Sequence, residues 1–342
     1  MGDVCYCPTD RFPRAFAVDG IESPCGYLPE PRAQGFDVLR TVCETCHDMG
    51  LKVHATMRPA ASRMPPLHWP RAKGDLFGGS RAVWQQGRAG EPVGHYSFAH
   101  PRVRQTLTEV LCEQVHDYPL DGVHLLLNRG WPFVGYEEHA FAPFTQEHGD
   151  APRQMDEMDP RWLAHRARYV SEFVRGLRQM LDEVGHQKGR RLAPSVTVMA
   201  GLEQCAYLGL DVAHWLGQGW LDRIVIHPCW LPNRWLDTHL APSMSVTPQR
   251  VAEIKALAGP VGCRVYADVY PRYMPPAEYP RRALEYYRAG ADGLCFCDTY
   301  CRVPRASEWS AIRRLGHTHE LEDLQTRARS FRTVTPSSRQ PG

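Results

Sequence analysis

Short apolar runs alternate along the chain with stretches in which apolar residues recur every three or four positions. Short runs bounded by Gly, Pro or Asp are typical of buried strands, and the longer period is typical of helices. The pattern predicts six strands, at residues 51–57, 122–127, 192–199, 221–226, 263–269 and 291–296. Because helical stretches separate these strands, we expect an α/β protein with a parallel sheet.

The helical period occurs in seven places along the chain. It predicts helices at residues 35–49, 102–116, 161–184, within 202–218, 248–257, 277–288 and 307–315. Two long segments, 58–99 and 128–160, lack a sustained period and are predicted to be loops. Long loops inside a compact domain usually have a function, so both segments are candidates for a site.

Repeated strand–helix units either close into a barrel or remain an open, doubly wound sheet. Neither GxGxxG nor GxxxxGK[ST] follows a predicted strand, which disfavours a nucleotide-binding open sheet. The long segments that follow strands suit the loops that carry the site of a barrel enzyme. We therefore predict a TIM-type (β/α)8 barrel as a single domain over residues 1–315, with a peripheral helix and a disordered tail over 316–342.

Composition narrows the class of partner. The 342 residues include 40 basic and 38 acidic side chains, for a net charge of +2, so no nucleic-acid partner is expected. The sequence has no apolar run near 18 residues and no signal peptide, which predicts a cytoplasmic protein without a membrane span. The twelve cysteines lack a second CxxC beside Cys43 and Cys46, so we expect ordinary thiols, no metal site and no cofactor.

The segment 120–136, LDGVHLLLNRGWPFVGY, joins a predicted buried strand to a loop rich in Gly, Pro and aromatic residues. Side chains alternate along a strand, so His124, Leu126 and Asn128 are expected to share one face. Asn128 and Arg129 follow the strand directly. Polar groups at the carboxyl end of a buried strand mark the place where (β/α) barrels carry out their chemistry.

Five segments, taken in order, resemble the glycosyl hydrolase-like family 10, a family of (β/α)8 glycosidases. They are GLKVHATMRP (50–59), YSFAHPRVRQTLTEVL (96–111), DGVHLLL (121–127), GWLDRIVIHPCW (219–230) and GADGLCFCDT (290–299). The resemblance covers about residues 36–315 and makes the predicted strands the third to eighth of the barrel. It implies that the barrel is incomplete at its N-terminal end: the first strand–helix unit is missing, and residues 3–7 are a remnant of the second strand. Unpaired strands at such an edge favour association into a homo-oligomer.

The resemblance also implies a carbohydrate substrate and hydrolysis by a pair of carboxyl groups. It places the family's acid of the fourth strand at Leu126, which cannot act as an acid. The best remaining pair is Glu203, after the fifth strand, as proton donor and Asp268, at the end of the seventh, as second carboxylate. Glu203 could instead cap the helix that it begins. Glu137 and Glu138, in the loop after the fourth strand, are further candidates.

A second group of residues is expected to bind the sugar. Aromatic rings stack on the apolar faces of sugars, and arginine side chains can hold the carboxylate of an acidic sugar. The residues predicted for this role are Arg58, His124, Asn128, Arg129, Trp131, Glu137, His227, Trp230, Tyr270 and Asp298.

Two other functions stay open from the sequence. Leu126 motivates a barrel that binds carbohydrate without cleaving it. Histidines on several strands resemble the layout of metal-dependent hydrolases, with His54, His124, His227 and Asp298 as the residues concerned. Because there is no H-x-H pair on an opening strand, buried, hydrogen-bonded histidines are the favoured interpretation.

Overall fold

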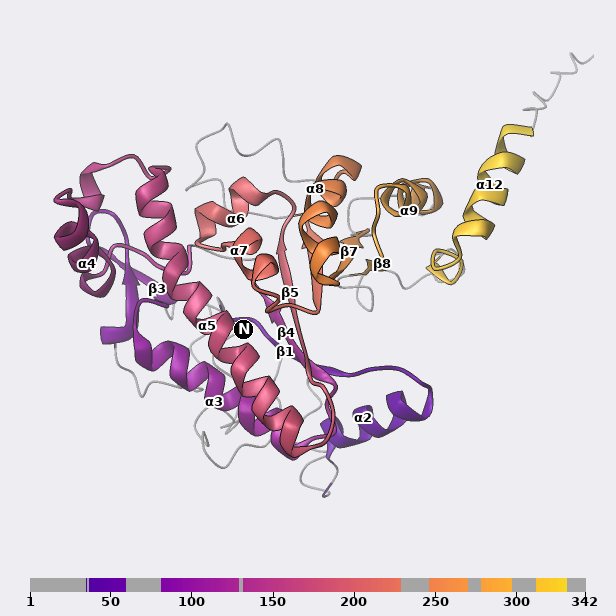
Figure 1. The fold of residues 1–342 in the computed structure, drawn as a ribbon, viewed down its shortest axis with the longest axis horizontal. Coiled ribbons are helices and arrows are strands. Elements are labelled where there is room, and N and C mark those ends of the chain that lie inside the picture. Colours follow the sequence, from indigo (N-terminus) through magenta and orange to yellow (C-terminus); the bar gives the residue numbers. More distant parts are fainter. Residues whose placement is uncertain are drawn as a thin grey trace, which may run out of the picture.

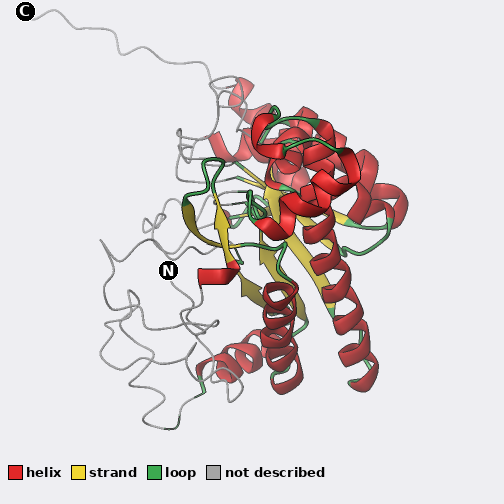
Figure 2. Ribbon diagram, turned by 90° about the vertical axis from the view of Figure 1, so that its left-hand side faces the viewer, coloured by secondary structure: helices red, strands yellow, loops and turns green. Residues whose placement is uncertain are grey.

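Six parallel strands form the centre of the molecule, a computed structural model that describes residues 35, 37–59, 81–128, 132–228, 246–269, 278–296 and 312–330. The strands are β1 (His54–Met57), β4 (Gly122–Leu126), β5 (Ala193–Met199), β6 (Arg223–His227), β7 (Arg264–Asp268) and β8 (Gly293–Cys295). Each pairs with the next in this series, in the order β1-β4-β5-β6-β7-β8. Figure 2 shows the strands in yellow, with the red helices packed beside them. The predicted parallel α/β sheet is confirmed, and closure of this row into a barrel stays a prediction.

Helices lie between successive strands and cover the sheet (Figure 1). The described helices are α2 (Val38–Asp48), α3 (Pro101–Asp117), α4 (Glu138–His148), α5 (Pro160–Gln187), α6 (Leu202–Leu208), α7 (Val212–Gly217), α8 (Pro248–Ala258), α9 (Tyr279–Arg288) and α12 (Thr318–Ser330). In the expected peripheral region, α12 packs on α9 and buries Leu321. None of the described helices combines the length and apolar character needed to cross a membrane.

The prediction that segments 58–99 and 128–160 are loops is partly wrong. Segment 58–99 contains an antiparallel hairpin of β2 (Trp84–Gln86) and β3 (Pro92–Tyr96), which is too short to show a period. Segment 128–160 contains α4, whose N-cap residue makes no side-chain capping bond and whose interior includes Pro143. Helix α4 therefore lacks the start signal that sequence reasoning depends on and carries a residue that normally interrupts a helix.

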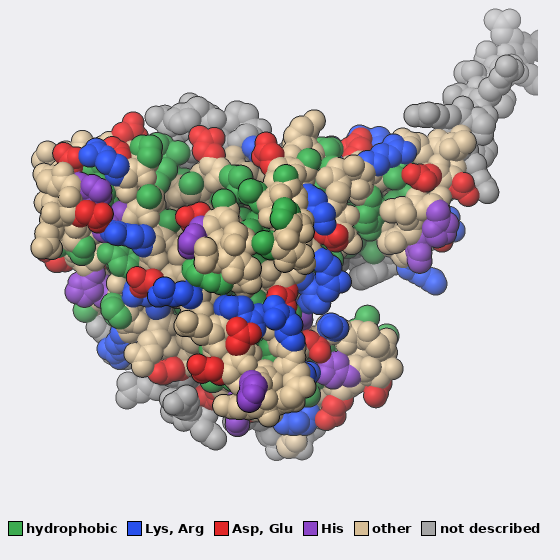
Figure 3. Space-filling view, viewed as in Figure 1, with side chains coloured by type: hydrophobic (Ala, Val, Ile, Leu, Met, Phe, Trp, Pro, Cys, Tyr) green, Lys and Arg blue, Asp and Glu red, His purple; other side chains and the backbone are tan. Residues whose placement is uncertain are grey.

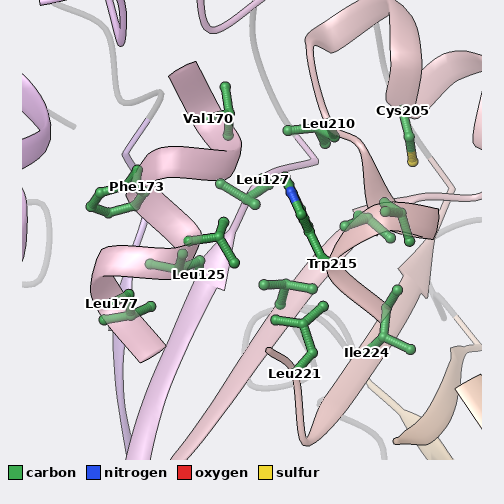
Figure 4. Close-up of a cluster of buried hydrophobic side chains, with 14 of the residues drawn as sticks. Leu125, Leu127, Val170, Phe173, Leu177, Cys205, Leu210, Trp215, Leu221 and Ile224 are labelled. Atoms are coloured by element: carbon green, nitrogen blue, oxygen red, sulfur yellow. The ribbon is translucent and has the colours of Figure 1, made fainter. Parts of the chain in front are cut away.

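The outer face of the sheet is apolar and packs against helices. Leu125 and Leu127 are fully buried, and so are Val196 and Ile224 on the neighbouring strands. Figure 4 shows these leucines beside α5 and the indole of Trp215, whose Nε1 donates a hydrogen bond to Ser171 Oγ (2.8 Å). Burial of this face supplies the main stabilising force of the fold.

Two Asp–Gly pairs at the starts of strands fix the register of the sheet. Asp121, before β4, accepts a bond at Oδ2 from the Val53 backbone N–H (2.8 Å), and its own N–H donates to the Val53 carbonyl (2.7 Å). Asp292, before β8, makes the same two bonds with Val265, at 2.8 and 2.7 Å. These bonds lock each strand to its neighbour at a single register.

Glycine after Asp121 is required by space. A Cβ on Gly122 would lie 2.0 Å from the Ala193 carbonyl oxygen of β5, so the strands could not stay at their present separation. We expect Gly122→Ala to lower the free energy of unfolding by about 2–3 kcal/mol, because backbone atoms must shift. Urea denaturation would measure the loss.

Gly176, inside α5, is the matched control because a Cβ there would meet nothing within 4 Å. Gly176→Ala should leave the free energy of unfolding unchanged or raise it by up to about 1 kcal/mol through helix propensity. Equal stability of the Gly122→Ala and Gly176→Ala variants would contradict the close strand approach.

Candidate functional site

A histidine and an aspartate meet at the carboxyl ends of β6 and β7. His227 and Asp268 are the last residues of these strands, which pair in register, and they are 2% and 1% exposed. Nδ1 of His227 donates to Oδ2 of Asp268 at 2.5 Å. The bond fixes the ring and the carboxyl group relative to each other in the region where barrel enzymes hold reacting groups.

A layer of polar side chains lies on the same inner face, nearer the amino ends of the strands. Arg223 Nη1 donates to His54 Nε2 (2.7 Å), so His54 carries its proton on Nδ1, which lies 3.4 Å from Ser195 Oγ. Ser195 in turn donates its hydroxyl proton to the carbonyl oxygen of Val123 (3.1 Å). The layer thus links β1, β4, β5 and β6.

His124 completes the layer. Because the Ser195 proton is directed to Val123, His124 donates from Nδ1 to Ser195 Oγ (2.8 Å) and accepts at Nε2 from Thr197 Oγ1 (2.7 Å). Burial, together with the neighbouring His54, lowers the pKa of His124 from 6.5 to about 4. Its ring is therefore neutral at pH 7.

These hydrogen bonds are relevant to the alternative function raised by the sequence, that of a metal-dependent hydrolase. Both ring nitrogens of His54 and of His124 already have protein partners. His227 lies at the other end of the strands beside Asp268. In the described ranges no three His, Cys, Asp or Glu side chains converge in a manner that could hold a metal ion, and Asp298 lies outside those ranges.

Glu203 lies in the first turn of α6, directly after β5, and its side chain is exposed. The N-cap of α6 is Gly201, so Glu203 is not the residue that caps this helix. A carboxylate in the first turn interacts favourably with the helix dipole. Glu203 follows β5 and Asp268 ends β7, so one strand, β6, lies between them in the sheet; Glu203 is exposed and Asp268 is buried.

Glu137 is buried instead of facing solvent, with an exposed fraction of 3%. Its Oε1 accepts bonds from Ser97 Oγ and from the Gly135 N–H (3.3 Å), and Oε2 accepts from the Gln86 N–H (3.3 Å). Burial raises the pKa of this carboxyl group, and the hydrogen bonds oppose that effect. The contacts tie the β2–β3 hairpin to the segment after β4. The neighbouring Glu138 is exposed.

The other predicted site residues divide into two groups. Arg58 is half-buried just after β1, Asn128 is 3% exposed just after β4, and Leu126 lies half-buried on the inner face opposite Thr197. The rest lie outside the described residues: Arg129, Trp131, Trp230, Tyr270 and Asp298.

Sequence reasoning missed Ser195, Thr197 and Arg223 as partners of the inner histidines. Their signal was present in the strand APSVTVM (193–199), where Ser and Thr alternate with valine. The alternation places both hydroxyl groups on the face opposite the buried valines. The alternation could not show which residues of the distant strands β1 and β4 would form hydrogen bonds with these hydroxyl groups.

The described residues thus form an α/β protein with a parallel sheet and a buried His–Asp pair at the carboxyl-terminal edge of that sheet. The chain belongs to the glycosyl hydrolase-like 10 family, whose profile matches residues 28–234, more than half of the sequence. No curated protein matches the chain.

Solved structures with a similar fold include α-L-fucosidase isoenzyme 2 from Paenibacillus thiaminolyticus. It is 14% identical, with a TM-score of 0.50, and the match covers 86% of this chain and 40% of that one. Chitinase ChiW from a Paenibacillus species is 11% identical, with a TM-score of 0.48, covering 84% and 36%. The chain thus spans less than half the length of either protein. At 14% identity, the likeness to the fucosidase concerns the fold alone.

We expect the buried state of His124 to make stability depend on pH. Its folded pKa of about 4 lies below the ordinary 6.5, so the unfolded chain binds more protons between these values. Stability should therefore be lost as the pH falls from 6.5 towards 4, at up to about 1.4 kcal/mol per pH unit for this group. Urea denaturation at a series of pH values would measure the slope.

The His124→Gln variant should show a shallower slope, since its amide can keep both hydrogen bonds but does not titrate. The same substitution at His186, an exposed residue in the last turn of α5, should leave the slope as in the wild type. If the slopes of His124→Gln and the wild type coincide, the histidine is not held neutral by burial.

Proposed function

We propose that this protein hydrolyses glycosidic bonds of an oligo- or polysaccharide at the carboxyl ends of a TIM-type barrel that includes the six described strands. Glu203 donates the proton to the leaving oxygen, and Asp268 is the second carboxylate. The observation that carries the proposal is the buried bond between His227 and Asp268 at adjacent strand ends. Membership of a glycosyl hydrolase-like family supports the reaction class.

Hydrolysis of a glycosidic bond requires an acid beside the leaving oxygen and a carboxylate on the other side of the anomeric carbon. Asp268 suits the second role because His227 holds its carboxyl group in a single orientation. Glu203 suits the first role because its exposed side chain follows β5, two strands away from β7 in the sheet, and can approach a bound sugar. In this proposal Asn128 and Arg58, at the ends of β4 and β1, bind sugar hydroxyl groups.

A second candidate is a barrel that binds carbohydrate without cleaving it. Leu126 favours this candidate, because it lies on the inner face of β4 where the family resemblance places an acid. A protein that binds an oligosaccharide but leaves it intact would support this second function over the first.

Turnover of Glu203→Gln and Asp268→Asn would test the catalytic pair. A panel of oligosaccharides is first screened for release of reducing ends by the wild type. With the best substrate, we expect kcat to fall at least about 100-fold in each variant, because each loses a group needed for proton transfer or charge stabilisation.

Glu253→Gln is the matched control, since Glu253 is an exposed residue of α8. It should keep the turnover of the wild type. Unchanged kcat in both Glu203→Gln and Asp268→Asn would refute the assignment of the pair.

A further inference from the structure

Two histidines from separate segments meet where the start of α4 lies beside the start of α3. His100 is the N-cap residue of α3, and His139 lies in the first turn of α4. The centroids of the two rings are 4.1 Å apart, and the ring planes are inclined at 53°. His100 is half-buried and His139 is exposed, so solvent reaches the pair from the side of His139.

Neither ring makes a hydrogen bond or an ion pair with another residue in the ranges that the structure describes. The His100 side chain does not cap its helix, and the contact of the His139 ring is the one with His100. By contrast, Nε2 of the half-buried His47 is bonded to the Asp121 carboxylate (2.8 Å). The ring nitrogens of the pair are therefore available to a ligand.

The His100 ring is neutral at pH 7. Burial, the neighbouring His139 and the charge of Arg104 lower the pKa of His100 from 6.5 to about 4. One nitrogen of a neutral imidazole carries a free lone pair. This is the form in which histidine binds zinc, copper and nickel ions.

The charges beside the pair do not oppose a bound cation. Arg104, whose charge acts on His100, is itself paired through Nη2 with Glu172 Oε2 (2.7 Å). A second acid, the exposed Glu138, directly precedes His139. These three charged side chains leave one negative charge in excess.

The backbone that carries the two histidines is held in place. Ser97, three residues before His100, donates its hydroxyl proton to the buried carboxylate of Glu137, two residues before His139. The His139 carbonyl oxygen also accepts a bond from Tyr169 Oη (3.1 Å). Rotation of the exposed His139 side chain is then sufficient to direct one nitrogen of each ring at a common point, at a small cost in conformational entropy.

We propose that His100 and His139 bind one divalent transition-metal ion, such as Zn²⁺, with water completing the coordination. Zinc lies about 2.0–2.1 Å from a ligating histidine nitrogen, so two nitrogens that share one ion are at most about 4 Å apart. The separation of the two rings suits that limit. Because one ligand belongs to α3 and the other to α4, the ion holds the segment after β4 against α3. No motif joins these residues, which are distant in the sequence, so the sequence alone predicted no metal site.

Calorimetric titration of the protein with ZnCl₂ tests the site, and it does not depend on the proposed glycosidase activity. We expect the His139→Gln variant to bind Zn²⁺ at least about tenfold more weakly than the wild type, because loss of an outer partner of a ligand already costs 10–100-fold. MgCl₂ should give no binding at the pair, since Mg²⁺ prefers oxygen ligands. His186→Gln, which changes an exposed histidine of α5, should keep the affinity of the wild type. Equal Zn²⁺ affinity of the wild type and His139→Gln would overturn the proposal.

A crystal of the wild type soaked in ZnCl₂ locates the ion without depending on the folding of a variant. The proposal expects an anomalous zinc peak at about 2.0–2.1 Å from one nitrogen of His100 and one of His139. A peak that touches one of these histidines alone, or zinc bound solely at other places, would overturn it.

Discussion

The two faces of each strand have opposite characters, and the register of the sheet keeps them apart. Leu125 and Val196 face the helices, while His124 and Ser195, one position away, face the interior. A slip of one residue would exchange these faces and bury the polar set against apolar helices. The bonds that Asp121 and Asp292 make with neighbouring strands oppose such a slip at β4 and β8.

The same register brings chemistry-bearing groups together from distant parts of the sequence. His227 and Asp268 are 41 residues apart, yet they meet because β6 and β7 pair in parallel and end at the same level. On the inner face below this pair, the hydrogen bonds of His54 and His124 leave both of their rings neutral. Basic and acidic side chains mix on the surface shown in Figure 3, in keeping with a net charge of +2. Among the described ion pairs, the one between His227 and Asp268 has both partners buried.

Local periodicity was sufficient to predict the parts of the fold that are long and regular. The six strands, α3 and α5 follow it to within a few residues, and alternation correctly predicted that His124 and Leu126 share one face of the sheet. The β2–β3 hairpin and α4 were not predicted, because the two strands are short and α4 contains Pro143. The sequence also identified His227 and Asp268 separately, but their bond arises from strand pairing, which no local pattern contains.

Glu137 is another residue whose surroundings depend on tertiary packing and could not be predicted from the local sequence. A glutamate in a loop after a barrel strand is a reasonable candidate for binding sugar. Its partners Ser97 and Gln86 lie 40 and 51 residues away, and they fix the carboxyl group under the hairpin. Arg166 is a related case, because a helical arginine is normally exposed and only tertiary packing buries this one.

The most direct test of the account is a crystal structure of the protein with a bound oligosaccharide, in which the separation of the Glu203 and Asp268 carboxyl groups is measured across the sugar. The account predicts that both groups flank one glycosidic bond, at about 5–5.5 Å for retaining chemistry or about 6.5–9.5 Å for inverting chemistry. A sugar bound away from the carboxyl ends of β5, β6 and β7, or carboxyl groups well beyond about 10 Å apart, would contradict it.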